Sequence, residues 1–530
     1  MKRVDDIFRN AYEKISGRFR TTFVSVILFG LVAHLYMFMN KLPNLDDIVT
    51  INSFGTTFRN GRWFLWVVGA IAYHLDLVFS LPWVNGLITL ILLGISAGLA
   101  AELLDMKSQT ANVLLGAAIV VFPSWTSTFF FMFTAPYYAL AVLMAVASIW
   151  LMVRYKKGIV LSVVLLACSL GIYQSYLPFT ATFYVVLLFL MLFDEAYGYF
   201  DILKKSLLYL LNIVLGVVFY FVCMKLSLLI TRQQLSQYKG VSTMGRLELS
   251  RIPKILKTIG VNFFGVFLNN NLEISYNYIT KGMYLVLFVL TTVLMIWLFA
   301  SFLKKKDVLK AIETVVLAAV YVVAINAIYI MCERGIYSLM YFSYVFLILF
   351  PLALLDRCMK QIQEKKIVIA EYVMMFVIIA GVLSYCHFAN GQYVSMQLSF
   401  SQALSYYTTM VTKIKSVEGY HEDMTVVFSG IDITDETLYH NEIMDTFTMT
   451  GRDNALADAY SKNEFIRYYC GFDAELTGPQ ILSEQSKEIL KHMPTYPNDG
   501  SIRILDNAVV VKLSEETAGT AGDNQAEWKD

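Results

Sequence analysis

The stretch TTFVSVILFGLVAHLYMFM, residues 21–39, decides the class of fold. A helix of this length and apolar character is about as long as the hydrocarbon core of a bilayer is thick. No small-residue cleavage site follows it, so the sequence predicts a retained membrane anchor rather than a signal peptide. The residues before it are basic: Lys2, Arg3, Arg9, Lys14, Arg18 and Arg20. Because basic flanks stay in the cytoplasm, we expect a cytoplasmic N-terminus and an extracytoplasmic residue 40.

The composition supports a membrane protein throughout the chain. Hydrophobic residues make up 57% of the sequence, charged residues 16%, and the mean hydropathy is +0.58. These values lie far from those of soluble domains. A formal net charge of +1 gives no electrostatic reason to expect a nucleic-acid partner. The six cysteines are scattered without metal-binding spacing, so neither a disulfide framework nor a zinc site is predicted.

The fold class predicted is an all-α polytopic membrane protein with a small soluble domain at its C-terminus. Apolar runs long enough to form spans recur along the first 388 residues. We predict about eleven transmembrane helices, at residues 21–39, 84–103, 111–123, 135–153, 159–174, 178–194, 206–230, 283–303, 311–331, 336–355 and 367–388.

One further apolar run, residues 63–83, contains His74 and Asp76. If it does not cross, roughly twenty basic residues fall on the inner side and about four in the short outer loops. If it crossed, every later loop would invert and the charge bias would be lost. The run is therefore expected at the outer surface or re-entering from it. Because His74 and Asp76 are costly to place in lipid, we expect them to line an outer cavity or to cap one another.

The long outer loop 231–282 is predicted to hold an amphipathic helix. Its apolar residues recur every three or four positions, at Leu249, Ile252, Ile255, Leu256, Ile259 and Phe263. Arg251, Lys254 and Lys257 fall on the other side. This pattern is typical of a helix in the membrane interface, and equally of one packed against the transmembrane helices.

Hydrophobicity falls after residue 388, and we predict an extracytoplasmic α/β domain at 389–513 and a disordered tail at 514–530. The expected strands are 425–428, 501–505 and 508–513, the last two joined as a hairpin by Asp506-Asn507. The expected helices are 453–469 and 483–492, opened by Asp453 and Ser483. The remainder, residues 1–388, is assigned to the membrane-embedded domain.

Two adjacent acids, Asp46 and Asp47, follow the first span on the predicted outer face. A carboxylate pair beside a membrane can accept a proton from a hydroxyl or hold a divalent cation. A structural explanation also fits, because Asn44 is a good helix N-cap and acids in a first helical turn favour the helix dipole. The residues alone leave both explanations open.

Three short motifs stand in order along the predicted outer face: Asn44-Leu-Asp-Asp47, Gly61-Arg-Trp63 and Gly171-Ile-Tyr-Gln-Ser-Tyr176. Together with the many spans they resemble the GT-C superfamily of membrane glycosyltransferases, over about residues 20–390. More specifically, they resemble the bacterial Gtr glucosyltransferases of the type-two, serotype-converting kind. The resemblance implies transfer of a sugar, expected to be glucose, from undecaprenyl phosphate to an O-antigen-like cell-surface polysaccharide. It implies a lipid-linked donor, a glycan acceptor and a location in the cell membrane.

The resemblance also assigns roles. Asp46 or Asp47 is expected to be the general base of an inverting transfer, and the other to orient the acceptor or a cation such as Mg²⁺ or Mn²⁺. No other cofactor is implied. Arg334, in the turn Glu333-Arg334-Gly335, is the first candidate for binding the departing phosphate. A pair with Glu333 or interfacial snorkelling explains Arg334 as well.

The other candidate substrate-binding residues are Arg62, Tyr173, Gln174, Asn44, His74 and Asp76. Arg62 is the second candidate for the phosphate, and its alternative is a role as interfacial anchor. Tyr173 and Gln174 are expected to bind sugar hydroxyls, although an aromatic-belt position also explains Tyr173.

Two other functions fit a polytopic chain. A transporter or lipid-linked saccharide flippase requires charged residues deep in several spans, and clear candidates for such positions are few, chiefly Lys225 and secondarily Glu102. A polysaccharide polymerase or ligase is expected to have a large, arginine-rich late outer loop, whereas the late loop here is the short Glu333–Gly335 turn. Chemistry confined to one face favours a transferase.

Overall fold

The computed structural model describes residues 13–155, 157–236, 249–268, 273–332, 336–361, 365–430, 442–443 and 461–515. It divides the chain into two compact units. The first comprises Met1–Met39 and Asn52–Asn390, and the second comprises Asn40–Ile51 and Gly391–Asp530. Arg334, Asp453 and the tail beyond residue 515 lie outside the described residues, so the predictions made for them stay predictions.

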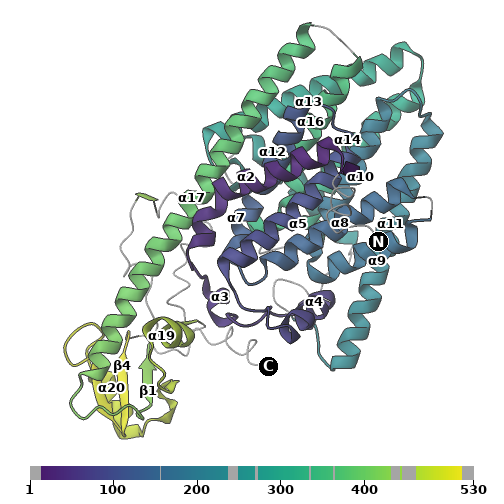
Figure 1. Ribbon diagram of the computed structural model, residues 1–530. Helices are drawn as coiled ribbons and strands as arrows, with labels where there is room; N and C mark the ends of the chain where they lie inside the picture. Colours follow the sequence, from purple (N-terminus) through teal and green to yellow (C-terminus); the bar gives the residue numbers. More distant parts are fainter. Residues whose placement is uncertain are drawn as a thin grey trace, which may run out of the picture. The chain divides into compact units, whose positions relative to one another are not determined.

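The first unit is helical (Figure 1). Its α-helices are α2 (Gly17–Met39), α4 (Trp63–His74), α5 (Pro82–Leu103), α6 (Gln109–Val121), α7 (Pro123–Phe130), α8 (Ala135–Arg154), α9 (Ile159–Ile172), α10 (Leu177–Leu192), α11 (Tyr199–Thr231), α12 (Ile252–Leu268), α13 (Tyr278–Lys304), α14 (Val308–Ile325), α15 (Ile328–Met331), α16 (Phe346–Gln361) and the first part of α17 (Lys365–Lys415). Its 3₁₀ turns are η1 (Phe58–Asn60), η2 (Gln174–Tyr176), η4 (Leu249–Arg251), η5 (Glu273–Ser275), η6 (Ser338–Met340) and η7 (Phe342–Val345).

Within the described residues, nine helical segments are long and apolar enough to cross a membrane, and they correspond to nine of the eleven predicted spans. The other two differ from the prediction. Residues 159–172 form a helix of only 14 residues, and residues 336–355 are divided among η6, η7 and the start of α16. The predicted all-α polytopic membrane fold is confirmed.

The ambiguous run 63–83 contains a short helix and not a full span. Helix α4 has 12 residues, and at 1.5 Å per residue it is about 18 Å long, against roughly 30 Å for a bilayer core. Asp76, just beyond its end, has a positive φ of 55°, and Pro82 begins α5. The length of α4 agrees with a run that lies at or re-enters from one surface.

Helix α5 packs against α2 through three glycines that accept phenylalanine rings. A Cβ on Gly86 would lie 2.5 Å from the Phe38 ring, and one on Gly94 would lie 2.7 Å from Phe23. Gly98 has the same relation to Phe19, at 2.5 Å. Small residues let membrane helices approach closely, because without a hydrophobic driving force their association depends on packing.

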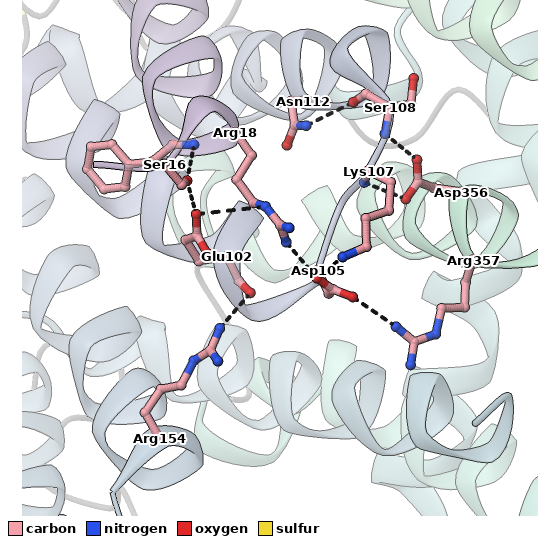
Figure 2. A network of polar contacts seen from close by, with 11 residues as sticks. Ser16, Arg18, Glu102, Asp105, Lys107, Ser108, Asn112, Arg154, Asp356 and Arg357 are labelled. Carbon is pink, nitrogen blue, oxygen red and sulfur yellow. Dashed lines mark hydrogen bonds and ion pairs between the residues drawn. The ribbon is translucent and has the colours of Figure 1, made fainter. Parts of the chain in front are cut away.

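One end of the first unit is tied together by ion pairs around Asp105 (Figure 2). The Arg18 guanidinium of α2 lies 2.7 Å from the Asp105 carboxylate, and Arg357 of α16 lies 3.2 Å away on its other oxygen. Lys107 also pairs with Asp105. At this end Arg154 donates to the Glu102 carbonyl. The segments that carry these basic residues were expected on the cytoplasmic side, and they meet at this one end of the first unit.

Helix α12 corresponds to the predicted amphipathic helix of the outer loop. Ile259, Phe263, Val266 and Phe267 are buried, and the helix contacts α13, α14 and α15. Leu256 is 55% exposed. The stripe therefore packs in part against transmembrane helices, which was one of the two expected arrangements.

The second unit contains a four-stranded sheet in the order β2-β1-β4-β3. The strands are β1 (Val426–Ser429), β2 (Leu476–Thr477), β3 (Ile502–Leu505) and β4 (Ala508–Lys512), with helices α3 (Leu45–Val49), α19 (Lys462–Cys470) and α20 (Glu484–His492) and the 3₁₀ turn η9 (Pro479–Ile481). Strand β1 runs parallel to β2 and β4. The predicted β3–β4 hairpin is present, and both residues of its Asp506-Asn507 turn have positive φ, as a type I′ turn requires.

Both faces of this sheet are covered. Val426 and Phe428 join an apolar cluster with the last part of α17 and with α19, whereas Val427 joins another cluster with Leu490 of α20. A strand buried on both faces is a continuous apolar run, which explains the sequence of β4. Ser483 caps α20 as predicted, accepting a hydrogen bond from the Ser486 N–H.

The division of the chain differs from the predicted one at residues 40–51. The sequence analysis placed this segment in the membrane-embedded domain, but it belongs to the second unit. The physical reason is Ile48, which is completely buried in the apolar cluster of that unit beside Tyr407 and Phe465. A local pattern of five residues carries no information about a contact with residues more than 350 positions away.

Candidate active site

The acid pair lies on α3, a helix of five residues in the second unit. Asn44 is its N-cap, and the Asn44 side chain accepts a hydrogen bond of 2.9 Å from the Asp47 N–H. Such a cap contributes about 1 kcal/mol. Asp46 and Asp47 both fall in the first helical turn. Asn44 is therefore a helix N-cap, as one of the two explanations of this motif expected. A capping role for Asn44 does not exclude a catalytic role for the acids.

The two acids have different surroundings. The Asp47 side chain is 1% exposed, and its Oδ2 lies 2.5 Å from the Lys41 ammonium. Asp46 is half-buried, and its carbonyl accepts the Thr50 N–H at 2.9 Å. A carboxylate enclosed with an ammonium is poorly placed to approach a substrate hydroxyl, and a half-buried residue is the better candidate of the two. The geometry thus favours Asp46 for proton transfer and Asp47 for holding the segment.

The second motif, Gly61-Arg-Trp63, is shaped by contacts with Gln174 and Tyr220. Gln174 Nε2 donates to the Asn60 carbonyl at 2.8 Å, and the Tyr220 hydroxyl donates to the Gly61 carbonyl at 3.1 Å. Gly61 has a φ of 70°, and a Cβ there would lie 2.6 Å from the Tyr220 hydroxyl. Only glycine fits this left-handed, crowded position without strain. The turn fixes the start of α4 and therefore the place of Arg62.

Arg62 lies over two tyrosine rings. Its Cζ is 5.4 Å from the centroid of Tyr173 and 6.0 Å from that of Tyr138. These two rings are stacked, with centroids 4.4 Å apart and planes 13° apart. The Arg62 Nε is buried and has no hydrogen-bond partner among the described residues. A guanidinium held by rings, with a donor unused, suits the binding of an anionic oxygen.

The third motif, residues 171–176, packs directly on the second. A Cβ on Gly171 would lie 2.7 Å from the Trp63 ring and 2.8 Å from Phe64. Tyr173 is buried in the stack below Arg62, and Gln174 uses its amide on the Gly61 turn. Two motifs about 110 positions apart thus form one cluster. In this cluster Tyr173 and Gln174 support Arg62. The sequence analysis expected these two residues to bind sugar hydroxyls and did not predict that they would contact Arg62 and its turn.

His74 and Asp76 are separated from this cluster along α4. Both of these described side chains are exposed. The His74 ring lies edge-on to Tyr73. Helix α4 ends at His74, and Asp76 follows with a positive φ, so the expectation that they cap one another gains no support and stays a prediction. A role in lining an outer cavity stays a prediction.

The possible binding of a divalent cation at the acid pair gains no support from the metal-ligating side chains of the described residues. Among the residues that the structure describes, no group of three or more His, Cys, Asp and Glu could hold a metal ion. Lys41 already neutralises Asp47. An ammonium on one carboxylate opposes a divalent cation at the same pair, so the acids fit a cation poorly.

Sequence reasoning missed several residues that shape these clusters. Tyr138 and Tyr220 lie within apolar runs and carry no local signal of a special role. Lys41 stands six residues before Asp47 and could have been proposed as its partner on charge alone. Tyr469, which packs against the apolar cluster that contains Ile48, lies in the part of the chain that resembled no family.

The comparisons with known proteins identify the family. A family model described as glucosyl transferase GtrII matches residues 35–352, more than half of the 530-residue chain. The chain therefore belongs to the GtrII family of glucosyl transferases, and it is a membrane-embedded glycosyltransferase. The suspected Gtr resemblance is confirmed. No match was found among curated proteins or among solved structures.

Proposed function

We propose that this glucosyl transferase moves glucose from a polyprenyl-phosphate carrier to a cell-surface glycan at the outer face of the membrane. The observation that carries the proposal is the contrast between the acids of α3. Asp47 is enclosed with Lys41, and Asp46 is half-buried, in a chain of the GtrII family. A transferase needs one carboxylate that reaches the acceptor, and α3 offers Asp46.

The proposed reaction is a single displacement. Asp46 takes the proton of an acceptor hydroxyl while that oxygen forms a bond to the anomeric carbon. The bond from the anomeric carbon to the phosphate oxygen breaks, and the lipid phosphate leaves with the electron pair. Attack opposite the leaving group inverts the anomeric configuration. No step requires a cation or another co-reactant.

Arg62 is proposed to bind the phosphate of the donor. Its support is the buried, unpartnered Nε and the tyrosine stack that orients the guanidinium. Negative charge accumulates on the leaving phosphate, and a preorganised cation stabilises it in the transition state. Arg334, the first candidate for the phosphate in the sequence analysis, lies outside the described residues and stays a candidate phosphate ligand. Tyr173 and Gln174 are proposed to act by holding Arg62.

The rival transporter function loses its two candidate charges. Glu102 lies at the end of α5 within the Asp105 network, where Arg18 approaches it. Lys225 is exposed on α11. Neither of these residues is enclosed within the helices as a translocation path requires.

The test is a transfer assay in detergent with labelled undecaprenyl-phosphate glucose and a surface-glycan acceptor. We expect Asp46→Asn to lower the rate about 100-fold, the usual scale for loss of a general base. Asp47→Asn, the comparison variant, should lower the apparent melting temperature, because it leaves Lys41 without its partner, and should reduce transfer less than Asp46→Asn does. Normal transfer by both variants would reduce the pair to a helix cap. Glucose translocation without release of lipid phosphate would support a flippase.

The proposed orientation has its own test. A reporter fused after residue 306 is expected in the cytoplasm, and one fused after residue 400 outside, because basic residues gather at 304–310 and 357–366. An external signal at 306 would overturn the placement of the acid pair on the outer face.

A further inference from the structure

Within the second unit, helix α3 packs against residues beyond 390, from which it is distant in the sequence. We call the part of the second unit that follows residue 390 the C-terminal unit. Ile48 is 0% exposed and packs in one apolar cluster with Tyr407 of α17 and Phe465 of α19. Helices α3 and α19 are in contact. A helix of five residues is too short to be stable alone in water. Its conformation therefore depends on the surface against which Ile48 is buried.

The same surface reaches the acid pair itself. Tyr469, on α19, packs against this apolar cluster, with its ring 5.1 Å from that of Phe465. Burial and the neighbouring Asp47 carboxylate raise the pKa of Tyr469. Its hydroxyl is buried and has no hydrogen-bond partner among the described residues.

The family match makes this arrangement informative. It covers residues 35–352, which include α3 but exclude α19 and the sheet. The segment that carries the acids is thus defined by the family, while the core that holds it is supplied by residues beyond the match.

We propose that the C-terminal unit is a positioning element of the transferase, and that Ile48 and Tyr469 are positioning residues that act through α3. The proposal rests on the proposed role of Asp46. Ile48 fixes the helix, and the Tyr469 ring packs against the cluster in which Ile48 is buried, so that Asp46 is presented in one orientation. Disturbing either contact should reduce the catalytic step more than the binding of the donor, because neither residue is proposed to touch the lipid phosphate.

The experiment measures kcat, KM for labelled undecaprenyl-phosphate glucose and apparent melting temperature on the full-length enzyme. Ile48→Ala is expected to lower kcat at least tenfold with KM nearly unchanged, and Ile48→Val to recover most of the loss. Leu490→Ala is the matched control, because Leu490 is similarly buried in the cluster on the other face of the sheet. It should lower the melting temperature and leave kcat within about twofold. An Ile48→Ala variant with the kcat of Leu490→Ala would overturn the proposal.

A second pair of variants keeps the test decisive if Ile48→Ala does not fold. Tyr469→Ala removes the ring that packs against the cluster, and Tyr468→Ala removes the ring of an exposed neighbour. We expect Tyr469→Ala to lower kcat severalfold and Tyr468→Ala to have no effect; equal kcat in both would contradict the proposal. Asp46→Asn in the same assay separates the two ideas. If it transfers normally, the proposed base is wrong; if it is inactive while the Ile48 and Tyr469 variants are normal, only the positioning role fails.

Discussion

Helix α8 connects two regions of the membrane-embedded unit in which the charged side chains have different surroundings. Tyr138 lies in its first turn, below Arg62, and Arg154 lies in its last turn, beside the Asp105 network. Around Asp105, three cations contact one carboxylate. Around Arg62, one guanidinium rests on aromatic rings with a buried donor unused.

The difference separates a charge with a structural role, at Asp105, from one for which we propose a functional role, at Arg62. A carboxylate shared by cations from several helix ends holds those ends together, and it gains nothing from a further ligand. An unused buried donor costs about 1–3 kcal/mol. The fold tolerates that cost at Arg62, where the Gly61 turn and the tyrosine stack fix the side chain. Such a position is suited to an anion that arrives with the substrate.

The largest effect that tests this contrast is expected at Arg62. Arg62→Ala should lower transfer about 100-fold and raise KM for the lipid-linked donor, because a preorganised cation for the leaving phosphate is lost. Arg62→Lys should be intermediate, since an ammonium cannot reproduce the planar guanidinium. Arg154→Ala, at the other end of α8, is the control and should transfer normally. Full activity of Arg62→Lys would favour a simple interfacial anchor.

A smaller effect is expected at the turn that precedes Arg62. Gly61→Ala places a Cβ 2.6 Å from the Tyr220 hydroxyl at a φ of 70°, which costs about 1–3 kcal/mol of strain. We expect transfer to fall about tenfold through displacement of Arg62. Adding Tyr220→Phe should recover part of the loss by making room. Gly260→Ala is the control, because nothing lies within 4 Å of the added atom; equal rates for both alanine variants would show that the turn does not position Arg62.

Much of the fold could be predicted because apolar runs report membrane helices directly. Nine predicted spans, the β3–β4 hairpin and the Ser483 cap follow from local patterns, and local patterns are what a single sequence contains. The parallel pairing of β1 with β4 was not predictable in this way. It joins residues about 80 positions apart, and nothing in either strand specifies its partner.

The candidate site was predictable as a set of motifs but not as a geometry. The resemblance grouped Gly61-Arg-Trp63 with residues 171–176, and Gly171 does pack on Trp63. It could not show that Lys41 encloses Asp47 or that Ile48 belongs to the core of the C-terminal unit. Those contacts depend on how distant segments pack, and they determine which acid is available for chemistry.

The smallest effect concerns the Asp105 network, and it is expected in stability and not in transfer. Burial opposes ionisation of Asp105, but hydrogen bonds and charge from Arg18 and Lys107 outweigh it and lower its pKa to about 2, from an ordinary 3.8. The carboxylate therefore stabilises the fold fully above about pH 4, and this contribution is lost as the pH falls toward 2. Because the side chain is 41% exposed, solvent screening limits the contribution to about 1 kcal/mol.

Asp105→Asn suits the test, because asparagine tolerates the positive φ of 53° at this position. At pH 7 the variant should melt a few degrees below the parent enzyme and transfer glucose at the same rate. The gap in apparent melting temperature should stay constant down to about pH 4 and close as the pH approaches 2, where the parent has lost the same ion pairs. Glu195→Gln, which removes an exposed pair with Lys305, is the control and should show almost no gap at any pH. A gap that does not narrow in acid would mean that Asp105 stabilises the helix ends by packing and not by charge, and the contrast with Arg62 would lose its electrostatic basis.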